Sequence, residues 1–254
     1  MAKKRKSNSK WWIFWLILFL LFTAAAWIAY DYTLTPPPPP AITHEADDIV
    51  RHPQPQKAWG IDISHHQGNI NWGKMVGENR PDFIFCKVTE GTHFSDNRFI
   101  DYRENINALK IPFSGYHFLR FNKNGKDQAQ YFLRKAQPKK GQLIPVVDIE
   151  YQRHLYTDEI AQRNIDLFME TIRSAIGVYP IVYCEEKYYH KYLKKKYQGK
   201  IILWIANYKR SPTTDWDIWQ KTDKFNHPSF KGRIDYNVLQ NGRIGMADLV
   251  LKGE

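Results

Sequence analysis

The centre of the sequence is an apolar run that ends in two acids, Leu143-Ile144-Pro145-Val146-Val147-Asp148-Ile149-Glu150. Its composition and length are typical of a buried strand. Side chains alternate along a strand, so Asp148 and Glu150 are expected on the same side, with Cβ atoms about 6–7 Å apart. Two solvated acids, or one acid paired with Arg153, would explain the same residues. The pair alone therefore does not establish a catalytic site.

Similar apolar runs recur on both sides of this strand and alternate with polar segments of helical period. The expected strands are Trp59–Ser64, Phe83–Thr89, Phe113–Leu119, Leu143–Ile149, Pro180–Cys184, Ile201–Ala206, Asp217–Gln220 and Ile234–Leu239. The expected helices are Asn97–Lys110, Lys126–Ala136, Thr157–Ile176 and Glu185–Tyr197. Strands that alternate with helices favour a parallel sheet covered by helices. The sequence thus predicts an α/β fold, a modified β/α TIM-like barrel. It should be irregular at its last two strands, which lie too close together for helical crossovers.

In such a barrel the polar residues at the carboxyl ends of the strands meet at one face, where the chemistry of these folds lies. They are Asp62, Glu90, Tyr116, His117, Asp148, Glu150, Tyr183, Glu185, Asn207, Gln220, Asp235 and Asn237. Two neighbouring carboxylates oppose each other's ionisation, which leaves a protonated acid beside an ionised partner. Cleavage of a glycosidic bond needs such a pair. The same strand ends carry candidate platforms for sugar rings, each of which is individually as consistent with a core role: Tyr116, Tyr183, Trp204, Tyr208, Trp216 and Trp219.

Eight segments can be compared with known families: Trp59–Gly68, Phe83–Gly91, Gly115–Phe118, Val147–Glu150, Pro180–Tyr183, Leu203–Ala206, Ile218–Gln220 and Ile234–Asn237. Together they resemble glycoside hydrolase family 25, the Chalaropsis-type lysozymes, and they occur in the order of that family's strands. The resemblance covers about residues 58–240. Its most specific parts are Asp-x-Ser-x-x-Gln-Gly at 62–68, Lys-x-x-Glu-Gly at 87–91 and Asp-x-Glu at 148–150.

The resemblance implies a lysozyme (N-acetylmuramidase) that hydrolyses the β-1,4 bond between N-acetylmuramic acid and N-acetylglucosamine in peptidoglycan. It implies that Glu150 is the general acid and that Asp148 orients the substrate's own acetamido group. Asp62 and Asp235 would complete an acidic floor. The expected substrate contacts are Glu90, Tyr116, Tyr183, Trp204 and Gln220. We expect a monomer that needs no cofactor and no metal, with the glycan strands of peptidoglycan as its partner.

Two other functions fit parts of the pattern. A chitinase-like barrel also ends a strand in Asp-x-Glu, but it should carry a further Asp two residues before Asp148, where this chain has Val146. A non-catalytic, membrane-tethered module that binds the cell wall would keep the aromatic residues and need no acid pair. The carboxylate spacing expected from strand geometry lies between the retaining and inverting ranges, so the stereochemical outcome stays open.

The two cysteines and the pair His65-His66 are expected to have structural roles. Cys86 shares the parity of Glu90 along its strand, whereas Cys184 has the opposite parity to Tyr183. One thiol should therefore point into the barrel and the other outward, as buried small side chains without a disulfide. Neighbours on a strand face opposite ways, and no set of His, Cys and carboxylate side chains has the spacing of a zinc site.

The N-terminal segment is expected to address the chain to a membrane. Residues 11–30 contain no charge, and a helix of that length spans roughly 30 Å, the thickness of the hydrocarbon layer. The segment begins at Trp11 and Trp12 and ends at Tyr30, as interfacial anchors do. The alternative is a cleaved signal peptide with its site in the run Ala24–Ala26.

Charge and composition complete the predicted domain organisation. Residues 1–10 carry five of the 37 basic residues and no acid, which predicts a cytoplasmic tail and export of everything after residue 30, to the periplasm or the cell surface. The remaining chain has 32 basic against 26 acidic residues, too small an excess to indicate nucleic-acid binding. Residues 31–57, with Pro36–Pro40, read as a Pro-rich linker. The catalytic barrel is expected over residues 58–251, and a cleaved N-terminus would make the protein secreted.

Overall fold

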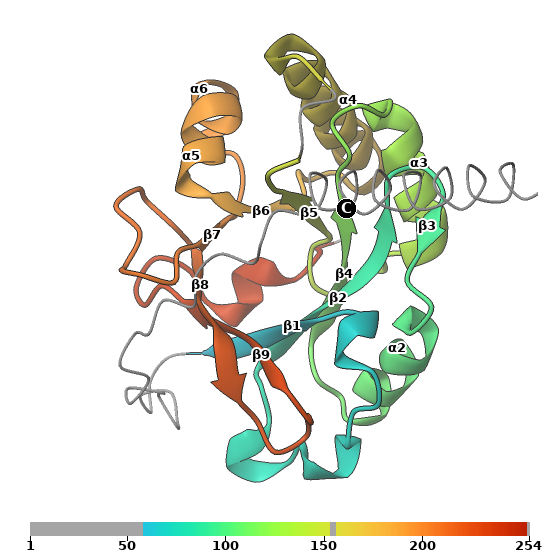
Figure 1. Ribbon diagram of the computed structural model, residues 1–254, viewed down its shortest axis with the longest axis vertical. Coiled ribbons are helices and arrows are strands. Elements are labelled where there is room, and N and C mark those ends of the chain that lie inside the picture. The colour runs from blue at the N-terminus through green and yellow to red at the C-terminus, as the bar shows by residue number, and fades with distance from the viewer. Residues whose placement is uncertain (1–57, 153–155, 253–254) are drawn as a thin grey trace, which may run out of the picture. The chain divides into compact units, whose positions relative to one another are not determined.

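The computed structural model describes residues 58–152 and 156–252. Eight strands form a closed ring in the order β1-β9-β8-β7-β6-β5-β4-β2, which closes through pairing of β1 with β2, and a short β3 pairs with the edge of β2 (Figure 1). The strands are β1 Trp59–Ile63, β2 Phe83–Glu90, β3 Phe94–Ser95, β4 Phe113–Phe118, β5 Val146–Ile149, β6 Ile181–Glu185, β7 Leu203–Ala206, β8 Ile218–Asn226 and β9 Arg233–Leu239. The predicted barrel is confirmed, and each expected strand lies at one of these positions.

The helices follow the strands around the outside of the barrel (Figure 1). They are α2 Phe99–Ala108, α3 Gly125–Ala136, α4 Asp158–Ile176, α5 Glu186–Tyr188 and α6 Lys194–Tyr197, with the π-helical turn η4 Tyr189–Leu193 between the last two. Short 3-10 turns are η1 His65–Gln67, η2 Trp72–Lys74, η3 Gly77–Asn79 and η5 Met246–Leu249. The Thr157 hydroxyl caps α4, and Gly177, at φ +80°, ends it, as its sequence signals predict.

The expected irregularity at the last two strands is confirmed. β1, β2, β4, β5, β6, β7 and β8 pair in parallel, whereas β9 runs antiparallel to both of its neighbours, β8 and β1. Only residues 227–232 join β8 to β9. A connection of that length makes a hairpin, because a parallel return needs a crossover of a dozen or more residues.

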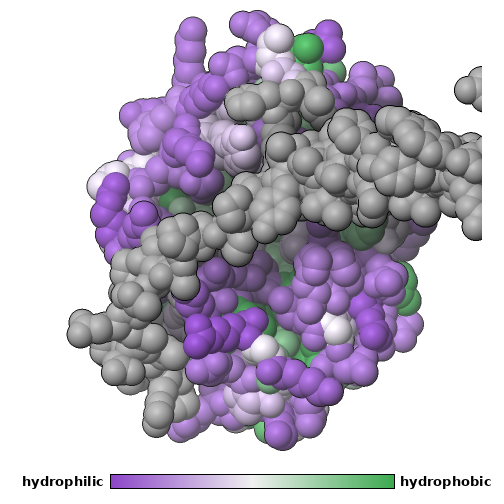
Figure 2. All heavy atoms as spheres, in the orientation of Figure 1, coloured by the Kyte–Doolittle hydropathy of each residue, from purple (hydrophilic) through white to green (hydrophobic). Residues whose placement is uncertain are grey.

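Alternating side chains divide the core into two layers. Phe83, Phe85, Val146, Ile181 and Trp204 fill the barrel interior. The other strand faces pack against the helices through a larger cluster that includes Ile84, Val147, Val182, Ile205, Ile165 and Phe168. Figure 2 shows a mostly hydrophilic surface in which hydrophobic residues appear in small separate patches. The apolar side chains of the strands are thus buried in the two internal layers, and polar side chains occupy the strand ends.

One prediction about strand parity is wrong because β2 contains a β-bulge. Its pairing with β4 shifts between Lys87 and Thr89, so residues before and after the bulge do not alternate regularly. Cys86 therefore does not share a side with Glu90. It packs in the outer layer, as Cys184 does, and both thiols are buried and free.

The predicted cytoplasmic tail, membrane segment and linker lie outside the described residues. Within residues 58–152 and 156–252, no helix has both the length and the apolarity needed to cross a membrane. The longest, α4, has 19 residues and buries only one face.

Candidate active site

The carboxyl ends of the parallel strands and the amino end of the antiparallel β9 surround a cavity of about 260 Å³. Four carboxylates line it: Asp62 on β1, Asp148 on β5, Glu150 just after β5, and Asp235 on β9. Its other lining residues include Ser64, His66, Gln67, Tyr116, Phe118, Tyr183, Trp204, Tyr208 and Gln220. The structure therefore brings together all four predicted catalytic residues and four of the five predicted substrate contacts.

Asp148 and Glu150 face the same cavity, as the alternation of a strand requires. Burial raises the pKa of Asp148 well above its ordinary value, the charge of Glu150 raises it further, and Lys87 opposes the shift. Burial also raises the pKa of Glu150, and the nearby Tyr183 hydroxyl opposes the shift. One oxygen of Asp148, Oδ1, is buried without a hydrogen-bond partner among the described residues. The pair can hold a proton, and it has one acceptor ready for a donor on a ligand.

Asp62 and Asp235 form a second acid pair. Burial raises the pKa of Asp62 to about 6, although hydrogen bonds from Asn237 and Gln220 favour its ionised form. Burial and the charge of Asp62 raise the pKa of Asp235 to about 9. At neutral pH the pair therefore carries about one charge, with the proton on Asp235.

The side-chain amides of two residues, Gln220 and Asn237, form hydrogen bonds to Asp62. Gln220 Nε2 and Asn237 Nδ2 both donate to Asp62 Oδ2, at 2.9 and 2.8 Å. Gln220 Oε1 accepts from the Tyr183 hydroxyl at 2.8 Å and the Tyr208 hydroxyl at 2.7 Å. Both amides are almost completely buried. They connect four strands, β1, β6, β8 and β9, and the loop after β7 into one polar network.

The predicted aromatic platforms divide into two groups. Tyr116, Tyr183, Trp204 and Tyr208 line the cavity, whereas Trp216 and Trp219 pack against the outer core. Trp204 lies on its floor, with its ring 4.8 Å from Phe85 and 4.7 Å from Tyr183, and is 2% exposed. Tyr208 is 50% exposed at the rim. Tyr208 is therefore accessible at the rim, while Trp204 shapes the base of the cavity, and stacking of either ring on a sugar stays a prediction.

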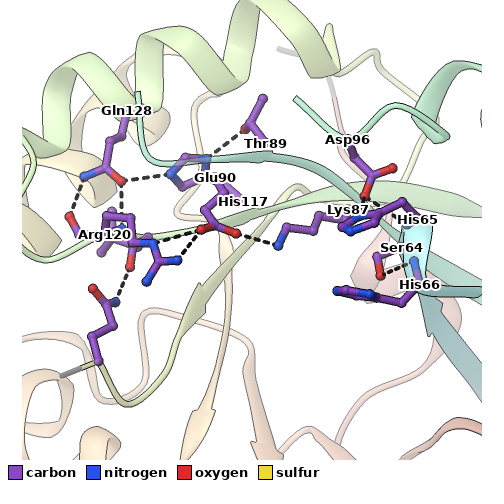
Figure 3. Close-up of polar contacts among 12 residues, drawn as sticks. Ser64, His65, His66, Lys87, Thr89, Glu90, Asp96, His117, Arg120 and Gln128 are labelled. Atoms are coloured by element: carbon purple, nitrogen blue, oxygen red, sulfur yellow. Dashed lines mark hydrogen bonds and ion pairs between the residues drawn. The ribbon is translucent and has the colours of Figure 1, made fainter. Parts of the chain in front are cut away.

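Glu90 is the predicted contact that does not line the cavity. Its carboxylate lies between Lys87, whose Nζ is 2.7 Å from Oε2, and Arg120, whose Nε is 2.9 Å from Oε1 (Figure 3). These bonds lower the pKa of Glu90, although burial opposes them. Its role as a substrate contact stays a prediction.

Lys87 lies beside the cavity acids, although it is not among the site residues predicted from the sequence. It is 8% exposed, and its ammonium lies 5.1 Å from the centroid of the Phe118 ring, which lines the cavity. Its charge lowers the pKa values of Asp148 and Glu150. The Lys-x-x-Glu spacing at residues 87–90 was the one indication of its position in the sequence. On a regular strand, however, residues three apart point to opposite sides of the sheet. The bulge in β2 places Lys87 and Glu90 on one side.

The histidine side chains at these strand ends interact with other side chains of the protein. His65 and His66 lie in the turn η1, with rings 4.0 Å apart, so the expectation that they face opposite ways is wrong. His65 Nδ1 is 2.7 Å from Asp96 (Figure 3). His117 is buried between Thr89 and Gln128, and burial lowers its pKa to about 3. In the part of the chain that the structure describes, no three His, Cys, Asp or Glu side chains are grouped to hold a metal.

A wider groove of about 700 Å³ runs along α4 and also contains acids. Asp158 there is solvent-exposed and hydrogen-bonded to Lys191 and Tyr192, and these bonds lower its pKa. Ionised, paired carboxylates cannot donate a proton. The chemistry therefore belongs to the smaller cavity at the barrel mouth.

Comparison with known proteins places this arrangement among sugar-cleaving enzymes. The sequence model of glycosyl hydrolases family 25 matches residues 61–230. The uncharacterized protein YegX of Escherichia coli K12 is 28% identical over 203 residues, 77% of this chain and 74% of that protein. A family 25 glycosyl hydrolase from Bacillus anthracis has a similar structure, with a TM-score of 0.69, 26% identity, and coverage of 80% of this chain and 97% of that one. A bacterial lysozyme from Streptomyces coelicolor also gives a TM-score of 0.69, with 25% identity and coverage of 77% and 96%.

Proposed function

The chain belongs to glycosyl hydrolases family 25, and from this we propose that it is a muramidase that hydrolyses the β-1,4 bond between N-acetylmuramic acid and N-acetylglucosamine in peptidoglycan. One observation carries the proposal: the carboxyl groups of Asp62, Asp148, Glu150 and Asp235 converge on a single cavity with raised pKa values. Glycoside hydrolysis needs one protonated acid and one carboxylate at the scissile bond, and such a cluster supplies both.

Glu150 is the general acid of the proposed reaction. Burial raises its pKa, which favours the protonated form that the reaction needs. As the bond between the anomeric carbon and the leaving oxygen breaks, that oxygen takes the proton of Glu150, and positive charge develops at the anomeric carbon. A water molecule later adds to this carbon and returns its proton to Glu150.

Asp148 stabilises the positive charge through the substrate's acetamido group. Its buried Oδ1 has no donor among the described residues, and an acetamido N–H is a donor of the right kind. That hydrogen bond would favour the ionised form of Asp148 when substrate is bound. The carboxylate would also hold the acetamido oxygen towards the anomeric carbon.

Digestion of purified peptidoglycan by the protein, with mass spectrometry of the products, tests this function. We expect disaccharide fragments that end in reducing N-acetylmuramic acid, no cleavage of chitin, and no fragments with Glu150→Gln. Fragments from chitin would favour a chitinase-like activity. Tight binding to the wall by the wild-type protein without any fragments would identify a non-catalytic wall-binding module.

A membrane tether outside the cytoplasm is the second part of the proposal. It rests on the uncharged residues 11–30, the basic residues before them and the proline run Pro36–Pro40. A tether would confine cutting to the wall near the membrane, which favours remodelling of the cell's own wall. The intact mass of the membrane-bound protein tests the anchor, because cleavage at Ala24–Ala26 would remove the N-terminal segment. Protein that is free in the medium and lyses foreign cells would contradict the remodelling role.

We also propose that the protein acts as a monomer, because the residues of one chain supply both acid pairs of the proposed reaction. Sedimentation of the active protein measures this directly.

A further inference from the structure

Gln220 uses both ends of its amide for hydrogen bonds within the protein. It is 2% exposed. Its oxygen accepts two tyrosine hydroxyl hydrogens, from Tyr183 on β6 and Tyr208 after β7, and its nitrogen donates to Asp62 on β1. The two tyrosines thereby fix which end of the amide faces Asp62. The side chain connects parts of the site that lie up to 158 residues apart in the sequence.

Asn237 provides an independent second support for the same carboxylate oxygen. The Trp204 indole is a donor only, so its 2.9 Å bond requires the oxygen of the Asn237 amide and turns the nitrogen towards Asp62. Asp62 Oδ2 therefore receives two N–H donors whose orientations are set by aromatic side chains. The other carboxyl of the pair, Asp235, interacts with Asp62 from β9.

We infer that Gln220 is a positioning residue of the proposed muramidase reaction, which breaks the symmetry of the Asp62–Asp235 pair by holding Asp62 as the anion and which fixes the Tyr183 hydroxyl beside Glu150. The inference rests on the proposed function. It assigns Gln220 a role behind the acids in place of the predicted contact with the sugar. Two N–H donors stabilise a carboxylate over a carboxylic acid, which leaves the shared proton on Asp235.

The consequence reaches Glu150 through charge. Ionised Asp62 raises the pKa of Glu150, as Glu185 does, while the Tyr183 hydroxyl and Lys87 lower it. The titratable and charged groups around this site are Asp62 on β1, His66 on η1, Lys87 and Glu90 on β2, Tyr116 on β4, Asp148 on β5, Tyr183 and Glu185 on β6, Tyr208 after β7, Asp223 on β8 and Asp235 on β9. Loss of the Gln220 donor would let Asp62 take up a proton, and the proton of the general acid would then be lost at lower pH.

Gln220→Met tests the inference with a side chain of similar size and no amide. We expect kcat on peptidoglycan to fall about 10- to 100-fold, from loss of a hydrogen bond to a charged group, with KM changed less than about threefold. The alkaline limb of the pH–rate profile should move to lower pH by about half a unit or more. A rise in KM with unchanged kcat would instead identify a substrate contact and overturn the inference.

Gln128→Met is the matched control, because Gln128 is also a fully buried glutamine with both amide atoms bonded, on α3 outside the barrel. It should lower thermal stability and leave the pH limbs in place. If Gln220→Met behaves in the same way, its role is only structural and the inference is wrong.

Carboxyl ¹³C NMR gives a readout that does not depend on activity. In Gln220→Met the titration of Asp62 should move to higher pH, and in Gln128→Met it should not. An inactive wild-type protein with this NMR shift would contradict the proposed muramidase but retain the effect of Gln220 on Asp62. An active wild-type protein without the shift would overturn the inference alone.

Discussion

The acidic residues of α4 and those of the barrel cavity differ in what surrounds them. On α4, Asp158 lies in solvent in the first turn of the helix and is bonded to Lys191 and Tyr192, and its pKa is lowered. In the cavity, Asp62 and Asp235 are desolvated beside each other, and both pKa values are raised. The same functional group is therefore favoured as the anion at one site and as the protonated acid at the other. Burial and the sign of the nearest charge decide which.

Glu150→Gln should show the largest effect of this difference. The amide cannot donate the proton that the leaving oxygen needs, so we expect the rate of fragment release to fall about 10³-fold with substrate binding retained. Glu159→Gln, on the exposed face of α4, is the control and should leave the rate unchanged. Equal rates for the Glu150→Gln variant and the wild-type protein would show that the proposed general acid in the cavity is not needed for the reaction.

The cavity pair should also reverse the usual effect of pH on stability. The folded-state pKa values of Asp62, about 6, and Asp235, about 9, exceed the ordinary value of 3.8. Between pH 4 and pH 9 the native protein therefore binds more protons than the unfolded chain, and the free energy of unfolding falls as pH rises through this window. We expect the double variant Asp62→Asn, Asp235→Asn to lose the part of this fall that these two residues cause, and to exceed the wild type by roughly 1–3 kcal/mol at the alkaline end. Asp148 and Glu150, whose pKa values are also raised, keep their part.

Urea denaturation at a series of pH values measures this difference. Curves of unfolding free energy against pH that stay parallel for the double variant and the wild type would contradict the raised pKa values. The activity of the double variant should be low at every pH, because it lacks two of the cavity acids. Its higher stability at alkaline pH therefore does not make it a better enzyme.

The residues in these predictions show which parts of the site a sequence reveals. Asp148 and Glu150 were predictable because alternation along one strand is a local rule. Asp235, predicted at a carboxyl end, lies near the amino end of β9 and meets Asp62 because β9 is antiparallel. The bulge in β2 was not predictable, because one extra residue leaves no signal in composition, and it decides where Lys87 points. The amide network depends on contacts between residues 158 and 175 apart, which no local pattern encodes.

Lys87→Met should move the pH dependence of catalysis in the direction opposite to Gln220→Met. Lys87 lowers the pKa values of Asp148 and Glu150, so its removal should shift both limbs of the pH–rate profile to higher pH by about half a unit or more. Lys191→Met removes an equal charge from the solvent-exposed pair on α4 and should leave both limbs in place. A profile unchanged by Lys87→Met would show that this buried ammonium supports only the fold.

Asp158→Asn should have the smallest effect and the opposite pH dependence to the cavity pair. A carboxyl whose pKa is lowered by folding stabilises the native state above its ordinary pKa of 3.8, and this stabilisation is lost as pH falls. The substitution should therefore lower the melting temperature slightly at pH 7 and leave it unchanged near pH 2. Because the pair with Lys191 is exposed to solvent, added salt should shrink the difference. Thermal unfolding at both pH values, with and without salt, measures this. If the difference in melting temperature between the variant and the wild type grew as pH falls, Asp158 would behave like the cavity acids. The contrast between exposed, paired carboxylates and buried, neighbouring ones would then fail at its simplest case.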